Sequence, residues 1–258
     1  MVTVARVFLI FDGYHENSIK NCTRYGRLSS VCAEIDLKLS APLPTQNTLL
    51  KFSKNKIKLI RLLVEYISLN LPHTLNKKLI ITASDPTPVE IFKGVITERR
   101  DLYTRHEEAD VIIPHQVISA IGKGSSCVRV LSDDTDVFVL LLHYLLPIDQ
   151  DVVPMVQMDS PKTEERDRAL INIMKTGLAH KPIIPHLLAA HSLLGNDTVP
   201  KLFGIGKNTV LKILKSHPLQ RLGDENQTID DVMQESRAFI AACYGFNSFT
   251  NTSFTEIR

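Results

Sequence analysis

The feature that most constrains this chain is the segment "RVLSDDTDVFVLLLHYLL", residues 129–146, in which three aspartates fall within four residues between two apolar stretches. The short apolar run 127–131 is typical of a buried strand, and the run 135–146 is typical of a helix that Pro147 ends. The aspartates must therefore lie where a strand passes into a helix. In parallel α/β sheets the carboxyl ends of strands are where ligands bind.

The first half of the chain shows the same alternation. Apolar runs at 7–11 and 77–83 predict buried strands, and the helical spacing of apolar residues predicts an amphipathic helix over 53–71. Thr104 and Glu107 match a capping box, which predicts a helix that continues to the glycines that follow. Strands that alternate with helices predict an α/β fold with a mostly parallel sheet and helices on both faces.

The pattern changes near residue 183, where two helical stretches surround a glycine-containing hairpin and no strand is evident. We therefore expect an α/β domain over 1–182, with a basic cap region near 14–76, and a helical annex over 183–258. The polar tail stops without a natural cap, and we expect the chain to be cut at both ends.

Composition favours an intracellular protein with one substantial core. The chain has 258 residues, of which 44% are apolar and 22% charged, and its four cysteines lie far apart and form no CxxC pair. The longest apolar run, 137–148, is too short to span a bilayer, and no signal-peptide core precedes Asp12. We expect a nuclear or cytoplasmic protein without a membrane segment.

Basic residues gather in two blocks that contain no acid, although the formal net charge is only +2. Two basic blocks beside an acidic centre suggest a polyanion held over metal ions. The alternative is that the lysines only solvate helix faces. The blocks are Lys51, Lys54, Lys56, Lys58 and Arg61, and Lys201, Lys207, Lys212, Lys215 and Arg221.

Acidic residues recur at the ends of the predicted elements. Two ionised carboxylates about 4 Å apart repel by roughly 4 kcal/mol at an effective dielectric constant near 20, so converging carboxylates require cations. Oxygen ligands without histidine or cysteine at ligand spacing favour Mg²⁺ or Mn²⁺ over zinc, and two such ions can support phosphodiester hydrolysis. Asp133 is expected to be a helix cap or a solvated neighbour, and Glu108 and Asp110 do not share a helical face. The candidate ligands are Asp12, Glu108, Asp110, Asp134, Asp136 and Asp197.

Four segments in this order, "VFLIFDGYHENSIK", "HEEAD", "VRVLSDDTDVFVL" and "HSLLGNDTVPKLFGIGKNTVLKIL", resemble the flap endonuclease and XPG-like 5′ nucleases of the PIN-like superfamily. Within that superfamily they are most similar to a multicopy group of animal proteins with a suggested mobile-element origin. The resemblance covers about residues 5–217 and is loose over 28–103. It implies an earlier strand that carries another aspartate, which either lies upstream in a longer protein or is lacking.

The resemblance implies roles for individual residues. Asp12 matches the acid after an early strand, Glu108 and Asp110 an ExE-like pair, Asp134 and Asp136 the DxD, and Asp197 the acid before the hairpin. In the family these carboxylates bind two divalent ions at the scissile phosphate. The basic residues that would orient this phosphate are Lys20 and Arg24 or Arg27.

The segment "LFGIGKNTVLKIL" resembles the helix-hairpin-helix element of these nucleases. Gly204 and Gly206 would let backbone amides approach a phosphate at the start of the next helix. Lys207 and Lys212 would add contacts that do not depend on base sequence. The alternative is a tight turn between packed helices.

These observations predict a nuclease with two Mg²⁺ or Mn²⁺ ions that acts on DNA with a single-stranded or junction feature, with RNA left open. A second hypothesis is a decayed or domesticated nuclease fold that binds nucleic acid or a protein. A third, a glycosyltransferase that uses the DxD, assigns no role to "GIGKNT" or "HEEAD".

Overall fold

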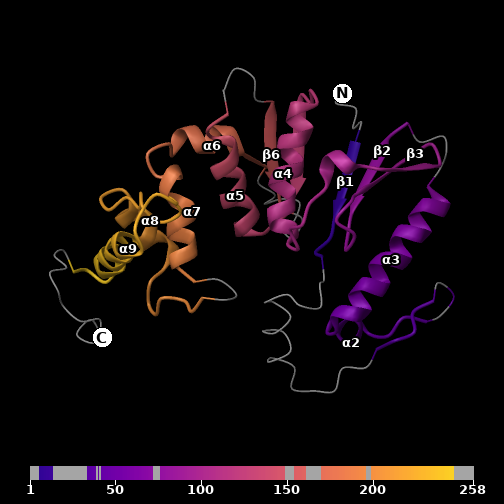
Figure 1. Cartoon of the computed structure of the whole chain (residues 1–258), viewed down its shortest axis with the longest axis horizontal. Helices are drawn as coiled ribbons and strands as arrows, with labels where there is room; N and C mark the ends of the chain where they lie inside the picture. The colour runs from indigo at the N-terminus through magenta and orange to yellow at the C-terminus, as the bar shows by residue number, and fades with distance from the viewer. Residues whose placement is uncertain are drawn as a thin grey trace. The chain divides into compact units, whose positions relative to one another are not determined.

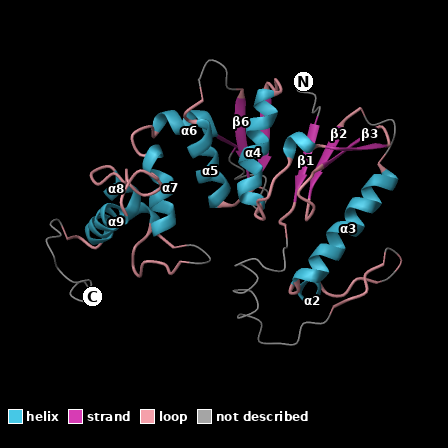
Figure 2. Cartoon of the chain, in the orientation of Figure 1, coloured by secondary structure: helices cyan, strands magenta, loops and turns pink. Residues whose placement is uncertain are grey.

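The structure is a computed structural model that describes residues 6–13, 34–38, 40, 42–71, 76–148, 154–160, 170–195 and 199–246. The chain divides into two compact units, Met1–Ser119 and Ala120–Arg258. Each unit combines helices with a small sheet (Figure 1 and Figure 2), which confirms the predicted α/β class. The domain boundary expected near residue 183 stays a prediction.

The first unit contains a four-stranded sheet in which the strands follow one another in sequence order. Its strands are β1 (Arg6–Ile10), β2 (Lys78–Thr82), β3 (Val89–Phe92) and β4 (Val95–Glu98). β1 and β2 pair in parallel, and the β2–β3 and β3–β4 pairs are antiparallel. The two strands that hydrophobic periodicity predicted here are thus confirmed, and Ile80, Ile81 and Ile91 supply the buried apolar side chains of this sheet.

β3 and β4 form a hairpin that the sequence analysis missed. Phe92 pairs with Val95, so the loop consists of Lys93 and Gly94 alone. Both loop residues have positive φ, 50° and 78°. Positive φ at both positions is what a type I′ turn requires, and the twist of such a turn matches the twist of the two strands it connects. The dipeptide Lys-Gly between two apolar runs was the available signal.

Helices of the first unit follow the predicted pattern in part. The predicted helix 53–71 is confirmed as α3, whose Ile60 is buried. Its buried Asn55 accepts a hydrogen bond from the backbone N–H of Ile35, at 2.9 Å, through Oδ1. The helices are α2 (Gln46–Leu50), α3 (Ser53–Asn70), the 3-10 turn η1 (Arg100–Leu102) and α4 (Ala109–Gly122), which runs past the boundary of the unit.

The second unit contains a three-stranded sheet made of β5 (Cys127–Leu131), β6 (Met155–Asp159) and β7 (Leu170–Asn172). β5 and β6 are parallel, with Leu131 opposite Asp159, and β7 is antiparallel to β6. The predicted strand 127–131 is confirmed. The sheets formed by the described strands are mixed, and not mostly parallel as predicted. In each sheet an antiparallel strand pairs next to the parallel pair.

Helices make up most of the second unit. The predicted helix after the aspartates is confirmed, and helices flank the predicted glycine hairpin. α7 packs against α5 and α8, and α8 packs against α9. The helices are α5 (Thr135–Leu145), α6 (Ile173–Ala179), α7 (Ile184–Leu193), α8 (Lys207–Leu214) and α9 (Ile229–Cys243).

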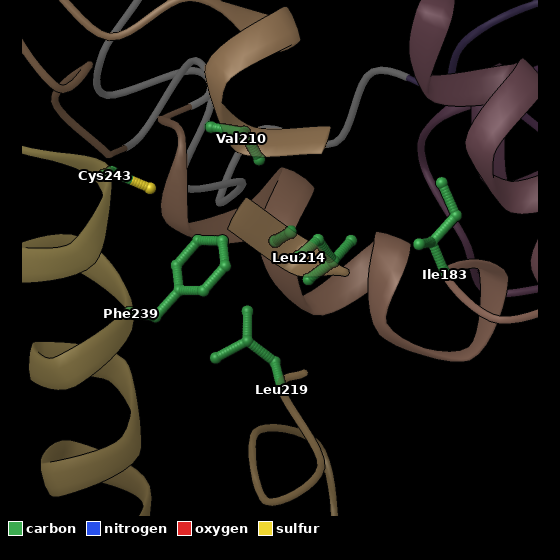
Figure 3. Close-up of a cluster of buried hydrophobic side chains, with 7 residues drawn as sticks. Ile183, Val210, Leu214, Leu219, Phe239 and Cys243 are labelled. Atoms are coloured by element: carbon green, nitrogen blue, oxygen red, sulfur yellow. The ribbon is translucent and has the colours of Figure 1, made fainter. Parts of the chain in front are cut away.

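One hydrophobic cluster joins α7, α8 and α9. Phe239 and Cys243 of α9 point toward Leu214 of α8 and toward Leu219 in the loop after it (Figure 3). Burial in apolar surroundings raises the pKa of the Cys243 thiol, so this cysteine packs as an apolar side chain. The cluster fixes the helices on both sides of the glycine hairpin.

Candidate functional site

Asp12 lies just beyond the end of β1, after Phe11, and caps the first helical turn of α4. Its Oδ1 accepts a hydrogen bond from the backbone N–H of Ala109 at 3.0 Å, and the N–H of Gly13 donates to the carbonyl oxygen of Glu107 at 2.6 Å. The acid after the first strand therefore lies against the "HEEAD" segment. Asp12 and the region of Glu108 and Asp110 are thus neighbours within the first unit.

The predicted capping box is wrong. The Thr104 hydroxyl accepts from the N–H of His106 at 3.1 Å, and α4 begins later, at Ala109. The cap comes instead from Asp12, 97 residues away in sequence. A local sequence pattern cannot indicate a helix cap when the capping residue is distant in the sequence.

Glu108 and Asp110 flank the capped residue and are both half-buried. The Asp110 carboxylate accepts a hydrogen bond from the N–H of Val111 at 2.9 Å, so one of its oxygens is turned back toward the helix start. The buried contact between Gln116 Nε2 and Thr82 Oγ1, at 2.6 Å, ties α4 to the end of β2. The first turn of α4 is thereby held beside the carboxyl ends of β1 and β2.

Asp134 is the N-cap of α5. Its Oδ1 accepts a hydrogen bond from the N–H of Asp136 at 2.9 Å, while its own N–H donates to the Ser132 hydroxyl at 3.1 Å. The capping role expected of Asp133 therefore belongs to Asp134. Asp133 is exposed in the same loop.

Asp136, in the first turn of α5, faces α7. Its Oδ1 lies 2.9 Å from Nε2 of His191, a residue that the sequence analysis did not select as a ligand or partner. The only available signal was the presence of this histidine in the "HSLLGND" segment. The contact joins the first turn of α5 to α7 within the second unit.

The helix that follows the glycine hairpin contacts residues 133–136, which we call the DDTD segment. Lys207, the first residue of α8, donates through Nζ to the Thr135 hydroxyl at 3.2 Å. Gly206 is the N-cap of α8, and Gly204 has a φ of +74° with open space around it. A lysine and a helix start thus lie beside Asp134 and Asp136 within one unit.

A further acid, Asp159, ends β6 and was missed. It pairs with Leu131 in the parallel register, and its carbonyl oxygen accepts from the N–H of Ser132 at 3.0 Å. It is buried, with 5% of its surface exposed. The signal was the same as for Asp12: an apolar strand that ends in an aspartate.

Several predicted site residues lie outside the described part of the chain. These are Lys20, Arg24, Arg27 and Asp197. Within the described residues, no three His, Cys, Asp or Glu side chains form a group that could hold a metal ion. Asp12, Glu108 and Asp110 belong to the first unit, and Asp134 and Asp136 belong to the second.

The two basic blocks are partly paired. Lys58 forms an ion pair with Glu34 at 2.9 Å and also donates to the Ile35 carbonyl, and Arg221 pairs with Asp231 at 3.0 Å. Lys212 is exposed. Part of each block therefore stabilises the fold, and Lys51, Lys54, Lys201 and Lys215 are exposed.

Comparison with protein-family models, curated proteins and solved structures found no match. None of the helices in the described ranges is both long enough and apolar enough to cross a membrane.

Proposed function

We propose that this chain is a divalent-metal-dependent nuclease of PIN-like fold that hydrolyses phosphodiester bonds in structured or single-stranded DNA. The observation that carries the proposal is the meeting of the DDTD segment with His191 and Lys207 in the second unit. An acidic pair beside an exposed lysine suits a phosphate held over cations. The order of the acidic segments along the chain supports the same class of reaction.

The proposal assigns the ions to carboxylate oxygens. Asp134 and Asp136 each use Oδ1 in a hydrogen bond, and their Oδ2 atoms accept none from the described residues. Such hard oxygen donors suit Mg²⁺ or Mn²⁺, and two bound ions would supply a hydroxide nucleophile and offset the phosphate charge. The assignment of Asp12, Glu108, Asp110 and Asp197 as further ligands rests on the sequence resemblance alone.

The chain's own residues orient the substrate in this proposal. Lys207 is exposed and lies next to the aspartates, where its ammonium group would contact a phosphate oxygen. Gly204 and Gly206 leave the backbone open to a phosphate at the start of α8, in the manner of a helix-hairpin-helix element. Lys212, Lys20, Arg24 and Arg27 are proposed as further phosphate contacts.

The decisive experiment measures cleavage of labelled flap, single-stranded and duplex DNA and of RNA, with Mg²⁺, Mn²⁺ or EDTA. Asp134→Asn and Asp136→Asn should each abolish metal-dependent cleavage, because they remove charge while they keep an oxygen and a similar size. Asp133→Asn is the matched control. It neutralises an exposed aspartate in the same loop and should leave cleavage intact.

Cleavage that survives both Asp134→Asn and Asp136→Asn would come from a contaminant and would reject the site. Loss of cleavage in the Asp133→Asn control as well would show that the loop needs its total charge and that no particular ligand pair acts. The three variants together separate a specific role of Asp134 and Asp136 from a general effect of negative charge in the loop.

The second candidate function is a nucleic-acid or protein binding module that has lost catalysis. It is favoured by the use of Asp12 and Asp134 as helix caps, a role that needs no metal. The same experiment separates the two functions. Tight, salt-sensitive DNA binding without cleavage in either metal would support the binding module.

A further inference from the structure

Phe203 stands out in the loop between α7 and α8 because 93% of its surface is exposed. Two residues later, Ile205 turns inward and packs against the hydrophobic cluster of α7, α8 and α9. The loop therefore has its own apolar anchor, and Phe203 is not needed for it. Phe203 is thus free of a packing role in this loop and is accessible to a binding partner.

The backbone that carries Phe203 is fixed from a distant part of the chain. The Tyr244 hydroxyl, at the end of α9, donates to the Phe203 carbonyl oxygen at 2.9 Å. Tyr244 is itself exposed, and so is the nearby Phe246. Since the carbonyl is held, the ring projects from an anchored loop.

The stretch of sequence that contains Phe203 is cationic. Residues 199–220 contain four lysines and no acidic residue, and all four lysines are exposed. One of them, Lys207, reaches the Thr135 hydroxyl between the two proposed ligands of the DDTD segment. The lysines are Lys201, Lys207, Lys212 and Lys215.

We infer that Phe203 is a stacking platform for an unpaired nucleobase of a polynucleotide whose phosphates contact the lysines of 199–220. Aromatic rings among cations bind single strands in this way, because every base has a face that can stack and the backbone is a polyanion. This inference deepens the proposed function by naming an unpaired nucleotide, next to the DDTD segment, as the part of the substrate that is bound. DNA and RNA share this chemistry, and both are tested.

The chain contains no tryptophan, so Phe203→Trp introduces a single tryptophan, which can be excited apart from the six tyrosines. Oligothymidylate and oligouridylate, added in EDTA to prevent cleavage, should quench the emission of this variant by stacking. A strand of abasic residues with the same charge should still bind through its phosphates, but it should quench the emission little because it has no base to stack. The control is Ile229→Trp, at an 81% exposed position followed by Asp230 and Asp231, whose emission should not change.

A second variant measures the contribution to affinity. Phe203→Ala should weaken binding of the base-containing strands about 10-fold, the usual effect of losing one stacked base, and leave abasic-strand binding unchanged. Circular dichroism is the check that both variants fold. A stronger effect with oligouridylate than with oligodeoxyuridylate, which has the same base, would assign the platform to RNA, and the reverse would assign it to DNA.

Unchanged emission of the Phe203→Trp protein with every oligonucleotide would overturn this inference and leave Phe203 as a contact for a protein partner. An equal loss of base-containing and abasic binding in Phe203→Ala would also overturn it, since stacking requires a base. The outcomes are independent of catalysis. Quenching without cleavage rejects only the nuclease, and cleavage without quenching rejects only the stacking platform.

Discussion

His191 Nε2 lies 2.9 Å from Asp136 Oδ1, so that α7 and the first turn of α5 are joined by a contact between residues 55 apart in sequence. The histidine side chain is 21% exposed and the aspartate side chain 44% exposed, which places the pair at the edge of the solvent. One carboxylate oxygen is thus oriented by a neighbour. The other is left available in the position that we propose for a metal ligand.

His191→Ala should lower the free energy of unfolding by about 1 kcal/mol, because a hydrogen bond to a partly exposed charged group is lost. It should also raise the Mg²⁺ concentration needed for half-maximal cleavage, because Asp136 is no longer oriented. His191→Gln retains a hydrogen-bond donor. It should therefore recover part of the lost stability and part of the lost response to Mg²⁺. Urea unfolding and a metal titration of cleavage measure the two effects. A His191→Ala protein that matches the native one in both would show that the contact is incidental.

Asp12 permits a test that separates its structural role from its proposed chemical role. Asn caps helices about as well as Asp, so Asp12→Asn should retain the hydrogen bond to Ala109 and the native stability, yet lose metal-dependent cleavage. Asp12→Ala should lose both, with a cost of about 1 kcal/mol in the free energy of unfolding. Denaturation and cleavage assays on the pair provide the comparison. Full cleavage by Asp12→Asn would leave this residue as a helix cap alone.

The secondary structure near the DDTD segment was predictable because it is encoded locally. β5 and α5 differ sharply in hydrophobic periodicity, and Pro147 marks the end of the helical run. The hairpin of β3 and β4 was also encoded locally, in Lys93 and Gly94, but its two short strands gave little periodicity. Strand pairing beyond a hairpin depends on distant contacts, so the mixed character of both sheets could not be read from the sequence.

The partners of the site residues were not predictable from local patterns. Asp12 caps a helix 97 residues away, and Lys207 reaches Thr135 over a separation of 72 residues. Sequence spacing suggested which acids could bind metal, but it could not show that Asp134 would act as a helix cap. Nor could it select His191 from nine histidines. These assignments need the tertiary contacts.

Glu90 of β3 gives the first unit a pH-dependent contribution to stability. Its side chain is 10% exposed and lies between Lys78, at 2.7 Å, and Arg99. Burial raises the pKa of this carboxyl, but hydrogen bonds from Lys78 and Arg99 outweigh it and hold the pKa below the ordinary value of 4.5. The ionised form therefore stabilises the folded state above pH 4.5, and this contribution is lost as the pH falls through the lower, folded-state pKa.

Glu90→Gln should consequently reduce the free energy of unfolding by about 2 kcal/mol at neutral pH, because Lys78 loses its counter-charge and Arg99 keeps only Asp101. The difference from the native protein should narrow as the pH falls below about 4.5. Thermal unfolding across that range measures it. The control is Glu98→Gln, whose exposed ion pair with Arg100 should contribute almost nothing at any pH. A difference that stays constant down to low pH would contradict the assignment to the Glu90 charge.

Gly195 follows the end of α7 and lies close to the backbone of Pro200 and Lys201. Its φ is +95°, and an added Cβ would lie 2.6 Å from Lys201 Cα and 2.7 Å from the Pro200 carbonyl oxygen. Backbone atoms at such distances cannot yield without a shift of the loop. Because this loop carries Phe203 and leads to Lys207, the shift would reach the residues that we propose to bind nucleic acid.

Gly195→Ala should therefore destabilise the second unit by more than its unusual φ alone accounts for. Gly223 is the matched control, since its φ is +98° and an added Cβ there would meet nothing within 4 Å. Gly223→Ala should cost about 1 kcal/mol from backbone strain, and Gly195→Ala at least about 2 kcal/mol more, because the clash is added to that strain. Chemical denaturation measures both variants. Equal costs would show that the chain at Lys201 moves aside freely, and the loop would then not be the rigid support that the stacking of a base on Phe203 requires.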